Sequence, residues 1–163
     1  MLERQVHFRI ENDPLDFNKT INNFKQPDPL RDRIGGFWTS TYHETFGCEY
    51  LQSGKIFKPY AHIYKGYLFQ VNSKTKAFCV STQEDEIILK EKYDSNFNHL
   101  ANDFDCIHVS GEYVKYLRKN RINSNFLHWT CECTWWFNIE MLKLIKVLDG
   151  EEIKKFTEVN LIK

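Results

Sequence analysis

The hydrophobic pattern of the chain begins with an alternation that is typical of a half-buried β-strand. Between residues 5 and 11 the apolar side chains share one face and the polar side chains share the other: Val6, Phe8 and Ile10 against His7 and Arg9. β-Branched and aromatic runs predict further strands. These runs cover residues 34–41, 61–72, 76–81, 106–110, 128–138 and 141–149, and a weaker alternation predicts one more strand at 153–162.

Helix signals separate these strands. Asp13 is a good N-cap, and Pro14 suits the first turn of a helix that we expect to reach Phe24. Thr82 precedes acidic residues and predicts another helix start. The expected helices cover residues 13–24, 42–51, 84–92, 96–102 and 111–119, and residues 25–33 are expected to form a loop. This order predicts a single α+β domain over residues 1–163, with short helices and a mostly antiparallel sheet.

The amino-acid composition excludes several classes of function but says less about the fold. Aromatic residues make up 15% of the 163 positions, whereas disordered chains contain few aromatics. Lys and Arg together number 22, as do Asp and Glu, so a general electrostatic attraction to nucleic acid or anionic membranes is unsupported. No apolar run is long enough to span a bilayer, and no signal peptide is visible. Five cysteines without a CxxC pair suit a reducing compartment, so we expect a cytoplasmic protein with no membrane partner.

Three separate segments carry polar groups that a purely structural sheet does not require. Arg9 lies on the polar face of the first strand, where it is either a ligand-binding cation or a paired surface residue. The segment GGFWTST, residues 35–41, is either a bulged edge strand or a binding element, because its glycines admit a ligand and its hydroxyls can orient a carboxylate. Glu132 lies in HWTCECTWW, where a carboxylate is either exposed or buried for a chemical purpose.

Taken in chain order, these segments resemble the ADP-ribosyltransferase family. In that family the first strand carries Arg or His, the second carries an S-T-S or G-x-Tyr element, and a later strand carries the catalytic Glu. HFR at 7–9 resembles the first element, and GFWTST at 36–41 is similar to both forms of the second. FDCIHV at 104–109 is similar to a Y-D-G-I-x-V strand, and Glu132 with the following CTWWFNIEML resembles the E-Y-V-V-F-N-P-x-Q-I ending of small bacterial and phage members. The resemblance covers roughly residues 6–145.

The resemblance implies a split, mostly antiparallel sheet, with NAD as the substrate. It assigns Glu132 to the ribose next to nicotinamide, and Thr39 or Ser40 to orienting that carboxylate. The implied NAD-binding residues lie mainly on the first two strands: Arg9 or His7 for the diphosphate or ribose, Gly35, Gly36 and Phe37 for docking nicotinamide, and Trp38 and Tyr50 for stacking on its ring. We therefore expect Arg9, Thr39 and Glu132 to converge on one cleft.

Two positions depart from the family pattern. Glu132 stands six residues before Asn138 rather than five, which requires a bulge or a shifted turn. Thr130 occupies the place where arginine-modifying members carry a second acid, so an arginine acceptor is not indicated.

The implied function is transfer of ADP-ribose from NAD, a glycosyl transfer, to a protein or nucleic-acid acceptor. The small size and the likeness to bacterial and phage members suggest a toxin, a phage-defence factor or an anti-defence effector, with an inhibitor or antitoxin protein as a further partner. The alternative is a catalytically inactive binding module of the same fold, which acts by contact with a protein or nucleic acid. Replacing Glu132 with Gln separates the two, since only the enzyme needs the carboxylate.

Two other clusters offer different chemistry. Cys131 and Cys133 follow His128 closely, but zinc ligand pairs usually have about two to four residues between them, so no metal site is expected. A basic run near Tyr113 and Tyr116 is either a solvated helix face or a docking surface for a nucleic-acid backbone: Lys115, Arg118, Lys119 and Arg121.

Overall fold

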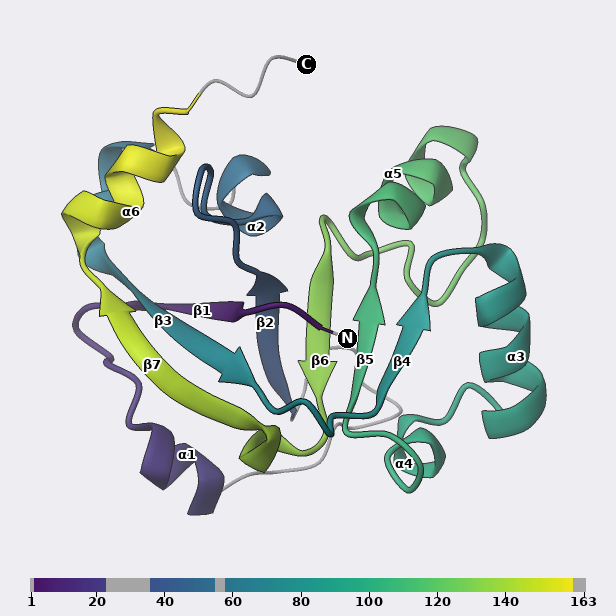
Figure 1. The fold of residues 1–163 in the computed structure, drawn as a ribbon. Coiled ribbons are helices and arrows are strands. Elements are labelled where there is room, and N and C mark those ends of the chain that lie inside the picture. The colour runs from purple at the N-terminus through teal and green to yellow at the C-terminus, as the bar shows by residue number, and fades with distance from the viewer. Residues whose placement is uncertain (1, 23–35, 55–57, 160–163) are drawn as a thin grey trace.

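The computed structural model describes residues 2–22, 36–54 and 58–159, which form one seven-stranded, mostly antiparallel sheet with short helices packed around it (Figure 1). The strand order is β4-β5-β6-β2-β1-β3-β7, and β4 with β5 is the one parallel pair among the described strands. The mixed α+β class predicted from the sequence is confirmed. In chain order the strands are β1 (Gln5–Ile10), β2 (Phe37–Thr41), β3 (Tyr64–Val71), β4 (Ala77–Val80), β5 (Cys106–Val109), β6 (Cys133–Trp136) and β7 (Leu142–Leu148).

The sheet divides into two parts between β1 and β2. β1 pairs with β3 along its whole length, but it pairs with β2 only through Gln5 opposite Thr41 and Val6 opposite Ser40. Beyond these pairs the two strands diverge, and Figure 1 shows β1 running across the direction of β2. Pairing thus continues within β4–β5–β6–β2 and within β1–β3–β7, and the two parts are joined only through the two residue pairs of β1 and β2.

Short helices connect and flank the strands. The helix start predicted at Thr82 is confirmed, and the structure shows a full capping box there. The Thr82 hydroxyl accepts from the Asp85 N–H at 3.3 Å, and the Asp85 carboxylate accepts from the Thr82 N–H at 2.9 Å. The helices are α1 (Phe17–Asn22), α2 (Glu49–Gln52), α3 (Gln83–Tyr93), α4 (Phe97–Leu100), α5 (Gly111–Asn120) and α6 (Gly150–Thr157), with 3-10 helices η1 (Lys58–Ile63) and η2 (Ile139–Met141).

β6 is buried on both faces, which makes it the centre of the core. Trp135 points into a cluster with Leu117 of α5 and Phe97 of α4, whereas Trp136 points to the opposite face and packs with Phe37 and Phe69. Both indoles are essentially inaccessible to solvent. Large aromatic side chains dominate the energy of such a core, so they fix the position of the segment that leads into β6.

The C-terminal tail forms a helix where the sequence predicts a strand. α6 starts after Asp149, whose carboxylate accepts from the Glu152 N–H at 2.9 Å, while the Glu152 carboxylate accepts from the Asp149 N–H at 3.2 Å. Ile153 and Thr157 are buried four residues apart on one helix face. The cap and this spacing outweigh the partial alternation, so the strand prediction is wrong for residues 153–157, and residues 160–162 lie outside the described residues.

Several other predicted elements are shorter than the sequence indicates. In the helix predicted at 42–51, a bridge between His43 and Gly47 closes a turn, and only α2 is helical. The strand predicted at 128–138 is limited to β6, and the first residues of the strand predicted at 61–72 belong to η1. The predictions for residues 23–35 lie outside the described residues.

Gly36 offers a test of this packing. Its φ of +65° disfavours a side chain, and a Cβ added there would overlap the indole of Trp135. Gly54 has a similar φ of +76° but no neighbouring atom within 4 Å of an added Cβ. We expect Gly36→Ala to lower the free energy of unfolding by about 2–4 kcal/mol, and Gly54→Ala, which adds only backbone strain, by about 1 kcal/mol. Urea unfolding measures both, and equal losses would contradict the packing of Trp135 on Gly36.

Candidate functional site

Glu132 is a buried carboxylate held by the last residue of β2. It lies immediately before β6, and its side chain is 10% exposed. Its Oε2 accepts from the Thr41 backbone N–H at 2.9 Å, and its Oε1 accepts from the Thr41 hydroxyl at 2.9 Å. Two donors from one residue fix the carboxyl group in one orientation.

The register of β2 and β6 explains this contact. Thr39 lies opposite Thr134. In the same antiparallel register Thr41 and Glu132 lie opposite each other, two residues further along, and alternation places both on the face of Thr39 and Thr134. The sequence assigned the orienting hydroxyl to Thr39 or Ser40, but neither side chain touches the carboxylate. The Thr39 hydroxyl donates to Gln5 Oε1 at 2.7 Å and accepts from Trp136 Nε1 at 2.8 Å.

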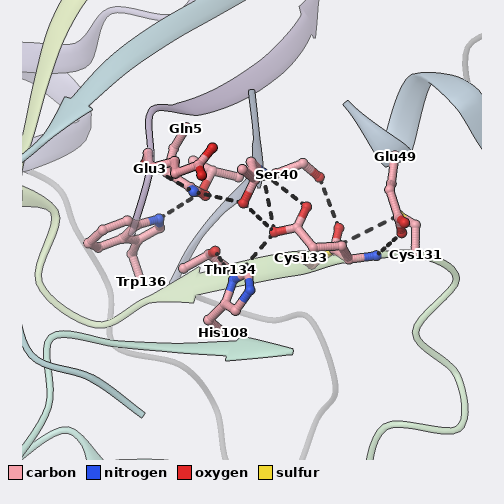
Figure 2. A network of polar contacts seen from close by, with 12 residues as sticks. Glu3, Gln5, Ser40, Glu49, His108, Cys131, Cys133, Thr134 and Trp136 are labelled. Carbon is pink, nitrogen blue, oxygen red and sulfur yellow. Dashed lines mark hydrogen bonds and ion pairs between the residues drawn. The ribbon is translucent and has the colours of Figure 1, made fainter. Parts of the chain in front are cut away.

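Ser40 holds the backbone of Glu132 rather than its carboxylate. The Ser40 hydroxyl donates to the Glu132 carbonyl oxygen at 3.1 Å, from the opposite face of β2. Figure 2 shows Ser40, His108, Thr134 and Glu49 around the start of β6, where Glu132 lies. Strand β2 therefore holds Glu132 through two residues: Thr41 orients the carboxyl group, and Ser40 holds the backbone.

Two residues beside Glu132 were not identified from the sequence. His108 of β5 places Nδ1 3.3 Å from Glu132 Oε1 and 2.9 Å from the Thr134 hydroxyl oxygen. Glu49 of α2 accepts from the Glu132 backbone N–H at 3.0 Å and forms an ion pair with Lys115 Nζ at 2.9 Å. Both reach the site through pairing and packing of distant segments, and no local motif marks either one.

Burial gives Glu132 an unusual protonation equilibrium. Desolvation raises the pKa of Glu132 to about 7, the nearby Glu49 carboxylate adds to this increase, and the Thr41 hydrogen bonds oppose it. Burial also lowers the pKa of His108, so its imidazole is neutral at neutral pH. A carboxyl group with a pKa of about 7 can give or take a proton near neutral pH, which is the property of a general acid or base.

The Glu132 carboxyl group faces a polar cavity of about 280 Å³ at the start of α5. Its walls come from β2, β5, α2 and α5, and they include Thr41, His43, Glu49, Ser81, His108 and Glu112. Here, polar and ionisable groups converge on a carboxyl group of shifted pKa, the combination expected of a reaction site.

A second, more apolar cavity of about 350 Å³ lies where β1 and β2 diverge. Trp38 and Tyr50, both predicted to stack on a ligand ring, line it. Phe8 stacks on Tyr50 with ring centroids 6.2 Å apart, and Trp38 stacks on Trp135 at 4.8 Å. The cavity reaches the Glu132 segment through Thr130 and Cys133, so the aromatic cavity and the polar cavity flank the same short stretch of chain.

Arg9 does not join Glu132, contrary to the convergence expected from the sequence. Its guanidinium pairs with Asp13 and is 37% exposed, near the far end of β1. Gln5, at the other end of that strand, is the residue that lies opposite Thr41. A span of four residues along a strand is about 13 Å, so Arg9 lies well away from the end of β1 that faces Thr41.

The other predicted NAD-binding residues of the first two strands have structural contacts. His7 Nδ1 lies 2.7 Å from the Trp38 carbonyl oxygen, and burial lowers the pKa of His7 to about 4. Phe37 is buried in the core, 4.4 Å from the His7 ring. Gly36 packs on Trp135, and Gly35 lies outside the described residues. Two cations of α5 contact neighbours of Glu132: Lys115 pairs with Glu49, and Arg118 donates to the Thr130 carbonyl at 3.4 Å.

Comparisons with known proteins identify no relative. No family model matches the chain, and no curated protein or solved structure matches it. In residues 2–22, 36–54 and 58–159, no group of three or more His, Cys, Asp or Glu residues is placed to hold a metal ion. None of the helices in these segments is both long and apolar enough to cross a membrane.

The raised pKa of Glu132 predicts a specific pH dependence of stability. The carboxyl is neutral in both folded and unfolded chains below pH 4.5, and only the unfolded chain ionises it freely between pH 4.5 and 7. The free energy of unfolding should therefore fall by about 3 kcal/mol over this interval relative to that of Glu132→Gln. Urea unfolding of both proteins from about pH 4 to pH 8 measures the difference. Parallel curves for the two proteins would contradict the burial of an ionisable group at this position.

Proposed function

We propose that this protein is an NAD-dependent ADP-ribosyltransferase in which Glu132 is the catalytic carboxylate. The observation that carries the proposal is the buried Glu132 carboxyl group, which Thr41 holds at the end of β2, the strand that carries Thr39, Ser40 and Thr41. The resemblance to the family predicts a late-strand Glu held by this strand. The divergence of β1 and β2 also supports the proposal, because the resemblance implies a split sheet.

The chemistry requires a negative charge beside the ribose. Departure of nicotinamide leaves positive charge on the anomeric carbon, in a transition state like that of glycoside hydrolysis. The Glu132 carboxylate stabilises this charge and accepts a hydrogen bond from the ribose 2′-hydroxyl, while the surrounding protein excludes water. Because this role needs the ionised form and the pKa of Glu132 is about 7, the rate of NAD cleavage should rise with pH through that value.

The aromatic cavity supplies a place for the nicotinamide ring. Trp38 and Tyr50 present ring faces and edges to a planar ligand, and Ser40 adds a hydroxyl for the amide group. In this arrangement the ring lies at the divergence of β1 and β2, and the ribose lies over the segment that carries Thr130 and Glu132. The cavities on either side of this segment support a two-part ligand such as a dinucleotide.

The diphosphate needs cations, and α5 supplies two that contact neighbours of Glu132. Lys115 is 2.9 Å from Glu49, which also contacts the Glu132 backbone, and Arg118 contacts Thr130. Charge-assisted bonds from these two side chains can hold the diphosphate. Arg9, which the resemblance assigns to this role, would have to leave its ion pair with Asp13.

The acceptor is a protein or a nucleic acid, and the resemblance to bacterial and phage members favours a toxin, phage-defence or anti-defence role. The exposed side of α5 carries Tyr116, 44% exposed, together with the basic residues Lys119 and Arg121. These residues continue outward from the proposed diphosphate site. They offer a backbone-binding surface for a nucleic-acid acceptor at the edge of the active site.

Replacing Glu132 tests the catalytic assignment. With NAD and a cell lysate, we expect Glu132→Gln to release nicotinamide about 10²- to 10³-fold more slowly than the wild type, because a few kcal/mol of charge stabilisation are lost. Glu91→Gln, on the exposed side of α3, serves as the matched control and should retain the wild-type rate. Release of nicotinamide is measured by chromatography. A wild-type protein that binds its target but releases none would instead be the catalytically inactive binding module.

Removing single cations tests the diphosphate site. We expect Lys115→Ala and Arg118→Ala each to raise the KM for NAD about tenfold, the loss of one charge-assisted contact. Lys115→Arg should restore most of the affinity because it keeps the charge, and Arg9→Ala should leave KM unchanged. Initial rates at varied NAD concentration give these values. An increase in KM for Arg9→Ala alone would contradict the site at α5 and would assign diphosphate binding to Arg9 of the first strand.

A further inference from the structure

Cys131 and Cys133 stand on either side of Glu132 in the sequence, and their sulfur atoms lie close together. Cys131 Sγ and Cys133 Sγ are 3.8 Å apart, although the residues flank a carboxylate that points the other way. The chain bends at Cys131 before β6 begins, which allows this approach. Figure 2 shows Cys133 near Ser40 at the start of β6, and Cys131 next to Glu49.

The other cysteines lie in different surroundings. Cys48 and Cys106 are fully buried, and desolvation raises the pKa of each thiol. Cys131 differs from them, because the Cys133 thiol and the Thr130 hydroxyl, 4.0 Å from Cys131 Sγ, act together to lower its pKa. Cys133 also lines the aromatic cavity, which gives small molecules a route to the pair.

We propose that Cys131 and Cys133 are a redox modification site, at which a hydroperoxide converts the two thiols to a disulfide that displaces Glu132. The structural part of this inference stands on the paired thiols alone. Its effect on turnover rests on the proposed function, because it regulates the same carboxylate.

The reaction consumes one peroxide and two thiols. The Cys131 thiolate attacks one peroxide oxygen, the O–O bond breaks, and hydroxide leaves and takes a proton, so that Cys131 becomes a sulfenic acid. Cys133 Sγ then attacks this sulfur, and the sulfenic oxygen leaves as water with the Cys133 proton. Both sulfurs are oxidised by one electron each, and the peroxide is reduced to two molecules of water when hydrogen peroxide is the oxidant.

We expect closure of the disulfide to move Glu132. An S–S bond is about 2 Å long, so the sulfur atoms must approach well beyond their present 3.8 Å. The backbone of Glu132 lies inside the ring that this bond closes. Its N–H contact with Glu49 and its carbonyl contact with Ser40, at 3.0 and 3.1 Å, are therefore disturbed, and the carboxylate is drawn away from Thr41.

Mass spectrometry tests whether the bond forms. Trypsin cleaves after Arg121 and Lys143, so one peptide, residues 122–143, carries Cys131 and Cys133 and no other cysteine. After mild treatment of the full-length protein with hydrogen peroxide, we expect this peptide to lose two hydrogen atoms and to regain them with dithiothreitol. Cys131→Ser and Cys133→Ser should each abolish the loss, whereas Cys79→Ser, at an exposed cysteine, should not affect it.

Hydrogen exchange tests whether Glu132 moves, independently of any activity. Oxidation should make the Thr41 amide exchange about tenfold faster, because it loses a charge-assisted hydrogen bond. Both serine variants should show no such change, and nicotinamide release by the wild type should fall on oxidation and recover on reduction.

Three results would overturn the proposal, and the first two are a peptide that keeps both thiols while Cys79 is oxidised and a complete disulfide that leaves Thr41 exchange unchanged. A protein that releases no nicotinamide in either state, yet forms the disulfide and frees the Thr41 amide, would refute only the proposed function. Faster Thr41 exchange in the serine variants as well would assign the effect to general oxidative damage and also contradict the proposal.

Discussion

The contact between Glu132 and Thr41 is the interaction on which the proposed site depends. It costs free energy to bury a carboxyl group, and two hydrogen bonds from one residue offset part of that cost without lowering the pKa to its ordinary value. The contact exists only because β2 and β6 pair in one register. That register is fixed by Trp135 and Trp136, which fill the two opposite sides of the sheet.

Local signals explain the parts of the fold that the sequence predicted. The strand predicted at residues 5–11 and the helix start predicted at Thr82 depend on neighbouring residues, and both are present, as β1 and α3. The burial alternation expected along β1 is wrong, because Gln5 is buried and Ile10 is 46% exposed. The strand prediction is wrong for residues 153–157 because Asp149, a helix cap with Glu152 in the matching position, outweighs the weak alternation there. The helix prediction for residues 42–51 is wrong for the first part of this segment, because a turn that the His43–Gly47 bridge closes stands there before α2.

The sequence predicted the site only through residues whose surroundings in the chain are unusual. A carboxylate among tryptophans pointed to Glu132, and the hydroxyl run pointed to β2, but choosing Thr41 required the register, which no local pattern contains. Glu49 and His108 come from segments far away in the chain. Arg9 was misplaced because an alternating strand gives the face of a residue but not its distance along the strand from its expected partners.

The central claim is that Glu132 lies beside the ribose of bound NAD. The most direct measurement is a crystal structure with a non-cleavable NAD analogue at saturating concentration. The account predicts the ribose 2′-hydroxyl within about 3 Å of the Glu132 carboxylate, with the nicotinamide ring between Trp38 and Tyr50. An analogue bound away from Glu132, or no bound analogue at all, would contradict it.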